Sequence, residues 1–386
     1  MSNFSNSLSK FIKELYRSED TIPLHAPVFM ANEENYVLSA INSTYVSSVG
    51  KFVDKFENDI AAYIGGTSCI ATVNGTSALH TALVLAGVKT GDLVMTQALT
   101  FVATCNAISY CGAQPVFIDV DRHTMGLSPT SLDNWLTEYA YIDDDGNCRT
   151  HIDNKIIRAC LPMHTFGHPV DFDSLLEVCL RWRLPIIEDA AESLGSLYKG
   201  AYTGTLGTIG TLSFNGNKII TTGGGGMIVT DKDIGARAKH LTTTSKVKSS
   251  YEFFHDQVGY NYRMPNLNAA MGCAQLEKLD YFIKIKRRLA ECYDEHLKGS
   301  SVDFVREPVN CRSNYWLNAV ICEDRDQRDV LLKETNDNKI MTRPIWTLMS
   351  QLPMYKNNLK GDLLESKWLA DRVVNLPSGV VENLKL

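Results

Sequence analysis

The sequence of 386 residues contains no CxxC pair, although it has ten cysteines. Structural zinc sites and thioredoxin-like redox centres carry such pairs, so their absence disfavours both kinds of site. Several cysteines stand inside apolar runs, as Cys160 does in IIRACLPM. We interpret them as buried, reduced thiols, which favours a reducing, cytoplasmic location.

Long apolar runs and an excess of positive charge are missing as well. No stretch approaches the roughly 18 uninterrupted apolar residues of a membrane-spanning helix, and the first residues, MSNFSNSLSKFIKELYRSED, lack the apolar core of a signal peptide. Lys and Arg number 38 against 44 Asp and Glu, for a net charge of −6. We therefore expect neither a membrane nor a nucleic acid as a partner.

From Cys69 onward, short apolar runs alternate with segments of helical periodicity. This alternation predicts an α/β domain around a mostly parallel sheet, whose ligands bind at the carboxyl ends of the strands. Amphipathic helices are predicted before it at 8–17, 32–43 and 51–64. The predicted strands are 69–73, 92–96, 115–120, 155–163, 185–190, 210–214 and 226–230, and the predicted helices among them are 77–87, 100–112, 129–140 and 171–183.

The pattern changes after residue 260. Residues 266–297 form one amphipathic stretch, which we predict to be a bent helix between two domains. Strand-like and helical runs alternate after it, which indicates a smaller α+β domain. We therefore predict a large domain with the N-terminal helices at 1–260, and the linking helix with a small C-terminal domain at 261–386.

The loop after the first predicted strand, NGTSAL, places Gly75, Thr76 and Ser77 where a strand ends and a helix begins. Exposed N–H groups and hydroxyls at the start of a helix suit an anion such as phosphate. The same residue types also form ordinary helix caps, so this motif alone leaves both interpretations open.

Two further motifs lie near predicted strand ends. Asp189 in IIEDA has a carboxylate that could bind a metal, act as a base, pair with a cationic nitrogen or cap a helix. Lys218 lies between the strand that ends near Ser213 and the four glycines at 223–226. Glycines permit a positive φ or a close backbone approach, and the strand-like GMIVT that follows argues against a flexible linker.

The three motifs together supply a phosphate site, a carboxylate and a lysine amine. Pyridoxal phosphate needs all three, because a lysine binds its aldehyde, a carboxylate keeps its ring nitrogen protonated, and N–H and hydroxyl groups hold its phosphate. We therefore expect this cofactor.

Six segments, in family order and at family-like separations, resemble the DegT/DnrJ/StrS-type nucleotide-sugar aminotransferases. The resemblance extends from about Pro27 to the TRPIW segment. It implies a fold type I pyridoxal-phosphate enzyme of the α/β class, with a mostly parallel mixed sheet flanked by helices in a large domain and a smaller C-terminal α+β domain. The segments are NGTSAL, LTFVAT, MHTFGHP, EDAAESLGS, SFNGNKIITTGGGGM and GYNYRMPNLNAA.

The resemblance implies roles for individual residues. Lys218 would form the Schiff base with the cofactor and move the proton during transamination, whereas the related sugar dehydratases carry His at that position. Asp189 would pair with the pyridine nitrogen. Phe101 would stack on the ring, the alternative being a plain core residue. Thr76, Ser77 and Ser213 would hold the phosphate, and Gly75 would also contribute to binding the cofactor.

Two other positions bear on the cofactor. Asn261 matches an Asn that reaches the phosphate across a dimer interface, so the resemblance implies a homodimer with shared active sites. Many members have Gln at the position of Glu192, near the ring hydroxyl of the cofactor. A carboxylate there must be protonated or share a proton with that oxygen, unless Glu192 faces solvent.

The segments 45–57, 96–117 and 342–355 look most like aminotransferases of the bacillosamine and legionaminic acid pathways. This implies amination at C4 of a nucleotide-linked 4-keto-6-deoxy-N-acetylhexosamine, with UDP-4-keto-6-deoxy-GlcNAc as the expected substrate and L-glutamate as the donor. A GDP or dTDP carrier fits equally. The substrate-binding candidates are Ser47, Gly50, Arg343 and Trp346, with ordinary packing as the alternative for the last two.

Three other interpretations stay open. The enzyme could aminate C3 of a 3-keto-6-deoxy sugar nucleotide, or the chain could be a catalytically inactive regulatory relative, although the intact set of lysine, aspartate and serine argues against inactivity. A metal site could use His164, His168 and Asp189. Gly167 lies between the two histidines and Pro169 follows them, which suggests a loop. We therefore expect no metal.

Overall fold

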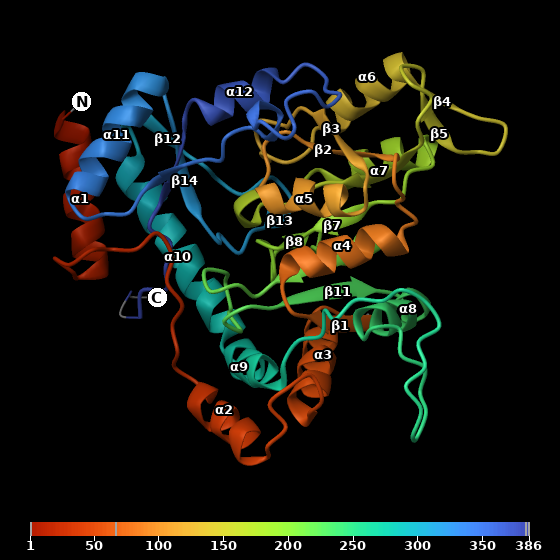
Figure 1. Ribbon diagram of the computed structural model, residues 1–386. Coiled ribbons are helices and arrows are strands. Elements are labelled where there is room, and N and C mark those ends of the chain that lie inside the picture. The colour runs from red at the N-terminus through yellow and green to blue at the C-terminus, as the bar shows by residue number, and fades with distance from the viewer. Residues whose placement is uncertain (1, 66–67, 383, 385–386) are drawn as a thin grey trace.

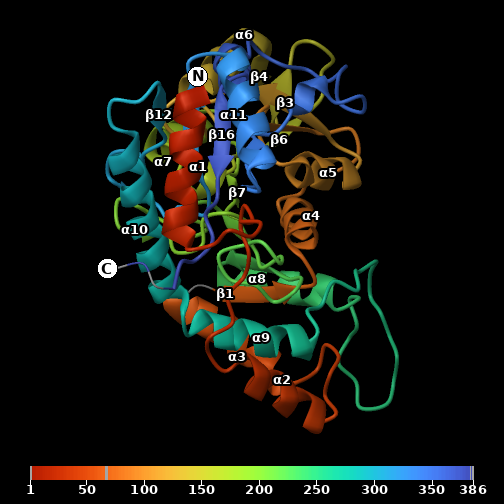
Figure 2. The ribbon, with the colours of Figure 1, turned by 90° about the vertical axis from the view of Figure 1, so that its left-hand side faces the viewer.

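A computed structural model describes residues 2–65, 68–382 and 384 (Figure 1). A central sheet with helices on both faces makes up most of the molecule, and a smaller sheet with its own helices adjoins it (Figures 1 and 2). None of the helices in the described ranges is long and apolar enough to cross a membrane.

The central sheet has the strand order β3-β2-β6-β7-β10-β11-β1. Backbone ladders join most neighbours, and parallel bridges from Cys160 to Ile186 and from Met163 to Asp189 join β6 to β7. Six of these seven strands point in the same direction, and β11 alone is antiparallel to them. The strands are β1 (Ser68–Thr72), β2 (Leu93–Gln97), β3 (Gln114–Ile118), β6 (Ile157–Leu161), β7 (Ile187–Asp189), β10 (Ile209–Ser213) and β11 (Gly226–Thr230).

Alternate residues of these strands enter different cores, because successive side chains point to opposite faces of a sheet. Ile70 and Val94 pack with one group of helices, whereas Ala71 and Met95 pack with the other. Both faces are therefore covered, as a mostly parallel sheet requires. The first group is α4 (Gly75–Leu85), α5 (Val102–Tyr110) and α8 (Lys232–Thr242), and the second is α3 (Lys51–Tyr63), α6 (Pro129–Tyr139), α7 (Phe172–Arg181) and α9 (Asn266–Leu276).

The smaller sheet is antiparallel, with the order β12-β14-β16-β15. The predicted fold class is confirmed: a large α/β unit with a mostly parallel mixed sheet, and a smaller α+β unit. The elements of the smaller unit are β12 (Val302–Phe304), β14 (Asn318–Cys322), β15 (Arg343–Pro344), β16 (Val373–Leu376), α10 (Leu279–Leu297), α11 (Arg325–Asp337) and α12 (Leu364–Ala370).

Helix α1 (Ser2–Tyr16) lies beside α11, as Figure 2 shows. Its Leu8 and Ile12 share a core with Leu289 and Val320. The first helix described thus packs on elements of the smaller C-terminal unit. The domain boundary between residues 260 and 261 stays a prediction. The connection predicted as one bent helix over 266–297 is two helices, α9 and α10, because the chain leaves the helix at Glu277 and Lys278.

Several short elements and helix α8 were not predicted from the sequence. A two- or three-residue strand is too short to show alternation, which explains most of these omissions. Helix α2 (Glu33–Asn42) lies within the predicted range 32–43. Short elements that were not predicted include β4 (Ala140–Ile142), β5 (Cys148–Thr150), β8 (Leu197–Tyr198), β9 (Ala201–Tyr202), β13 (Cys311–Arg312), and the 3-10 turns η1 (Thr165–Gly167) and η2 (Met349–Gln351). The elements β12, β15, β16 and α12 of the smaller unit were not predicted individually either.

Candidate active site

An inner cavity of about 310 Å³ lies at the carboxyl ends of β1, β7 and β10. These strands run parallel, so the residues that follow them meet at one edge of the sheet. Most of the cofactor-binding residues predicted from the sequence line this cavity. They are Gly75, Thr76, Phe101, Asp189, Glu192, Ser213 and Lys218.

The start of α4 forms an anion site in this cavity. Asn74 caps the helix by accepting a hydrogen bond from the Ser77 N–H at 2.8 Å, so this N–H is already used. Gly75 packs so closely on Ser213 that a Cβ at residue 75 would lie 2.9 Å from the Ser213 Cβ. The hydroxyls of Thr76 and Ser213 have no hydrogen-bond partner among the described residues and line the cavity. A phosphate fits these free donors; a role for Ser77 stays a prediction.

Asp189 ends β7 and is buried. Its Oδ2 accepts a hydrogen bond from the Thr104 hydroxyl at 2.7 Å, and its Oδ1 accepts one from the Ala191 N–H at 3.2 Å. Burial raises the pKa of Asp189, while these hydrogen bonds and the charge of Lys218 oppose the rise. A protonated ring nitrogen in the cavity would compensate this buried carboxylate. Sequence reasoning did not assign Thr104 a role.

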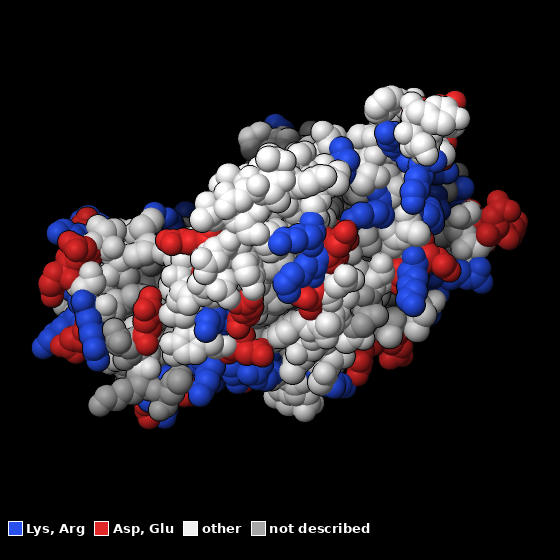
Figure 3. Space-filling view, turned by 90° about the horizontal axis from the view of Figure 1, so that it is seen from below, with Lys and Arg blue, Asp and Glu red and all other residues white. Residues whose placement is uncertain are grey.

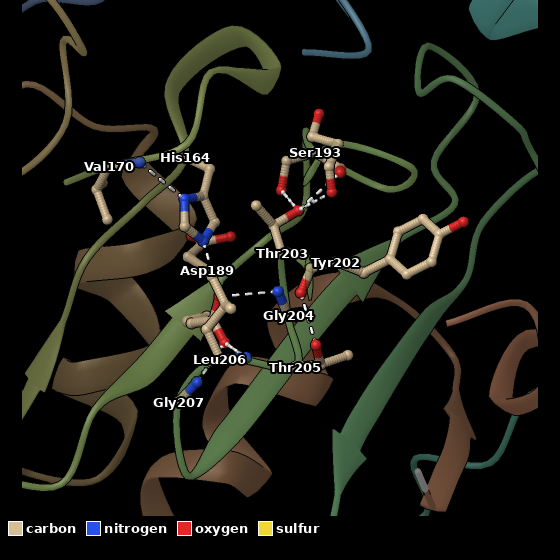
Figure 4. A network of polar contacts seen from close by, with 12 residues as sticks. His164, Val170, Asp189, Ser193, Tyr202, Thr203, Gly204, Thr205, Leu206 and Gly207 are labelled. Carbon is tan, nitrogen blue, oxygen red and sulfur yellow. Dashed lines mark hydrogen bonds and ion pairs between the residues drawn. The ribbon is translucent and has the colours of Figure 1, made fainter. Parts of the chain in front are cut away.

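A buried network lies behind Asp189 (Figure 4). Glu188 accepts hydrogen bonds from the backbone N–H groups of Gly204, Leu206 and Gly207, and it lies 2.9 Å from His164 Nε2. The other ring nitrogen of His164 accepts from the Val170 N–H. Both nitrogens of His164 are therefore engaged, which leaves neither open to a metal. No group of three or more His, Cys, Asp or Glu side chains in the described ranges could hold a metal ion.

Glu192 is buried beside Lys218, so the solvent-facing alternative is wrong. Its Oε1 lies 3.3 Å from Lys218 Nζ, and its Oε2 accepts a hydrogen bond from the Phe166 N–H at 2.9 Å. Burial raises the pKa of Glu192 to about 7, although the charge of Lys218 lowers it. The carboxyl can therefore hold a proton near neutral pH, as a neighbouring ring oxygen would require.

Trp316, which was not predicted to have a role, completes the surroundings of Lys218. Lys218 Nζ lies 4.0 Å from the centre of the Trp316 ring, a cation–π contact. The indole N–H donates to the carbonyl of Asn217 at 2.7 Å, which fixes the ring beside the lysine. Trp316 lies inside the strand-like run YWLNAVI at 315–321, two residues before β14 begins, and no feature of that run marked it as functional.

An outer cavity of about 480 Å³ adjoins the inner one. Phe101, Glu192, Asn215 and Lys218 line both cavities. Phe101 is 47% exposed, so it is not a plain core residue, while its stacking on the cofactor ring stays a prediction. Of the substrate candidates, Arg343 and Trp346 line the outer cavity.

Four predicted residues line neither cavity: Ser77, described above, and Ser47, Gly50 and Asn261. The carbonyl of Ser47 accepts a hydrogen bond from the Asn266 N–H at 2.6 Å, and Gly50 packs against the Asn266 side chain. Asn261 is exposed and forms an isolated bridge with Thr243. Their proposed roles in binding stay predictions.

A family model described as the DegT/DnrJ/EryC1/StrS aminotransferase family matches residues 28–383. The chain belongs to this family. The resemblance inferred from the sequence is thereby confirmed, together with the enzyme class and the cofactor: the chain is a sugar aminotransferase that depends on pyridoxal phosphate.

Individual relatives of this aminotransferase extend over nearly its whole length. It is 37% identical over 358 residues to "GDP-perosamine synthase" of Escherichia coli O157:H7, covering 92% of this chain and 93% of that one. It is 34% identical over 367 residues to "Putative pyridoxal phosphate-dependent aminotransferase EpsN" of Bacillus subtilis, covering 93% and 91%. The aminotransferase TlmJ of Streptoalloteichus hindustanus superposes with a TM-score of 0.83 at 26% identity, covering 93% of each chain.

Proposed function

We propose that this enzyme transfers the amino group of L-glutamate to C4 of a nucleotide-linked 4-keto-6-deoxy hexose. The outer cavity is the observation that carries the proposal, because it opens onto Lys218 and has Arg343 and Trp346 in its wall. A guanidinium suits a diphosphate, and an indole suits a sugar face or a base. A nucleotide sugar carries such groups beyond its reactive carbonyl.

Two carriers of the hexose have support. The resemblance of three segments to bacillosamine and legionaminic acid enzymes favours UDP-4-keto-6-deoxy-GlcNAc. Three relatives named GDP-perosamine synthase, at 37, 36 and 35% identity, favour a GDP-linked sugar aminated at the same carbon. A relative named UDP-2-acetamido-2-deoxy-3-oxo-D-glucuronate aminotransferase, 31% identical over 286 residues, supports amination at C3 as the second candidate.

The residues of the inner cavity divide the work of transamination. Bound pyridoxal phosphate supplies an electron sink for the carbon that gains or loses the amine. Thr76, Ser213 and the start of α4 would hold its phosphate, and Asp189 would keep its ring nitrogen protonated. Lys218 Nζ would take the proton from Cα of glutamate, which leaves as 2-oxoglutarate, and later give a proton to C4 of the sugar.

The proposal is tested by supplying the enzyme with L-glutamate and one keto sugar at a time. UDP-4-keto-6-deoxy-GlcNAc and GDP-4-keto-6-deoxymannose are the two substrates, and nuclear magnetic resonance of the product locates the new amine. We expect an amine at C4 of at least one of them. No amino sugar from either substrate, with 2-oxoglutarate released only in the glutamate half-reaction, would contradict the proposal.

The enzyme is also proposed to act as a homodimer. Apolar side chains are exposed on the loop 246–258, among them Tyr251 and Phe253, and others are exposed beside α2, among them Tyr45 and Val49. Figure 3 shows a broad area without Lys, Arg, Asp or Glu on the face seen from below. A second copy on these surfaces would cover them and could bring Asn261 to its active site.

Light scattering during size-exclusion chromatography measures this directly. We expect a mass of twice 43.0 kDa at micromolar concentration. Replacement of Phe253 by Asp should shift the mass towards the monomer, because a carboxylate would be buried without a partner. A wild-type mass of a single chain would contradict the homodimer.

A further inference from the structure

The wall of the outer cavity contains buried polar atoms that have no partner. Nine buried side-chain nitrogen and oxygen atoms in the described part of the chain lack a hydrogen-bond partner. Both ring nitrogens of His25 and Oδ1 of Asn375 are among them, and both residues line the outer cavity. Buried polar groups are normally paired, so three unpaired atoms on two residues that line one cavity leave hydrogen-bonding capacity for a ligand there.

Distant parts of the chain bring the two residues together. Asn375 stands in β16 between Ala319 of β14 and Arg343 of β15. Residues directly opposite in a sheet share a face, so Asn375 and Arg343 both face the cavity. The Ser378 N–H donates to the Leu24 carbonyl at 2.7 Å, which ties the segment that contains His25 to the end of β16.

His25 is uncharged in this position. Burial lowers its pKa well below the usual range, and the positive charges of Lys286 and Lys218 lower it further. A neutral imidazole offers one donor and one acceptor, and the free Oδ1 of Asn375 adds an acceptor. Such a set matches hydroxyl and amide groups, whereas a carboxylate or a diphosphate would favour the guanidinium of Arg343.

We propose that His25 and Asn375 recognise the hexose of the nucleotide-sugar substrate through its hydroxyl or acylamino groups and so determine which sugar the enzyme accepts. Arg343, on the same face of the sheet, would meet the charged part of the substrate. This inference rests on the proposed function. His25 and Asn375 would bind the hexose and would not contact the amino donor.

Calorimetric titration of the holoenzyme tests the inference without turnover. The probes are UDP-N-acetylglucosamine against UDP, and GDP-mannose against GDP, so that each difference measures the hexose alone. We expect the wild type to bind one sugar nucleotide more tightly than its nucleotide. The substitutions His25→Phe and Asn375→Val should each raise the Kd of that sugar nucleotide about tenfold. The Kd of the nucleotide without its sugar should stay unchanged.

A matched control comes from the neighbouring strand. Asn318 in β14 is also buried with an unpaired Oδ1, but it does not line the cavity. Asn318→Val should therefore retain the wild-type preference for the hexose. Equal binding of sugar nucleotide and nucleotide by the wild type, or an undiminished preference in both cavity variants, would overturn the inference.

Turnover separates this inference from the proposed function. In the cavity variants, the half-reaction with L-glutamate should keep its wild-type rate, while KM for the keto sugar rises. Slowing of the glutamate half-reaction by the same factor would contradict a role confined to the hexose. If the wild type binds the hexose but aminates neither keto sugar, the proposed function fails while the recognition by His25 and Asn375 stands.

Discussion

Replacement of Lys218 by Ala should lower kcat by at least about 10³-fold, because one amine is expected both to bind the cofactor and to move the proton. In the structure this side chain contacts Glu192 and Trp316 and opens onto both cavities. The neighbouring groups are a carboxyl and an indole, and neither can replace an amine. Steady-state release of 2-oxoglutarate from L-glutamate and keto sugar measures the loss.

The loss must be separated from an effect on folding. The side chain of Lys218 makes one hydrogen bond among the described residues, to Glu192. The circular dichroism spectrum and the Tm should therefore change little. Lys333→Ala is the matched control, since that lysine is exposed on α11 and pairs with Asp337. Lys218→Arg keeps the positive charge and should be as inactive as the alanine variant. Activity within tenfold of the wild type in Lys218→Ala would refute the assigned role.

Replacement of Asp189 by Asn should lower kcat by about 10- to 100-fold. The variant removes the buried negative charge that would hold a proton on the ring nitrogen, and a hydrogen bond to a charged group is worth about 1.5–3 kcal/mol. Asn has nearly the same shape, so the cavity should keep its size. The rate of the glutamate half-reaction, followed by absorbance in a stopped-flow instrument, measures the effect.

Thr104 provides a graded comparison for the same carboxylate. Thr104→Val removes the hydroxyl that donates to Asp189 Oδ2 at 2.7 Å but keeps the charge. The loss should therefore be smaller, about 2- to 10-fold. Asp173→Asn is the surface control, because this carboxylate is exposed and pairs with Lys199. An Asp189→Asn enzyme as fast as the wild type would mean that the carboxylate does not act on the ring nitrogen.

The large sheet and the inner cavity could be predicted from the sequence because their signals are local. Each strand of the large sheet is a short apolar run, and Asp189 and Ser213 end their strands as expected. The cavity residues follow strands that run in parallel. Prediction of those strands was therefore enough to place the residues at one edge of the sheet. Lys218 was singled out because it stands between a predicted strand and the four glycines at 223–226, and the family resemblance implied its role.

The rest of the site depends on contacts between distant segments, which periodicity does not encode. Asn375 comes from the smaller sheet, Trp316 from the segment just before β14 and His25 from the N-terminal segment, and they reach the site only because the two units pack together. Thr104 was overlooked for another reason: its hydroxyl is buried on α5, where a threonine is usually a packing residue. Burial and hydrogen bonding in the structure identify its partner.

Reduction of the purified enzyme with borohydride tests the central claim most directly. We expect pyridoxal phosphate to be joined to Lys218 through its aldehyde, so reduction should fix the cofactor on the peptide that contains this residue. Mass spectrometry of the digested protein would then show the added mass on Lys218, and prior treatment with L-glutamate should prevent it. A cofactor fixed on another lysine, or no addition after incubation with pyridoxal phosphate, would contradict the account.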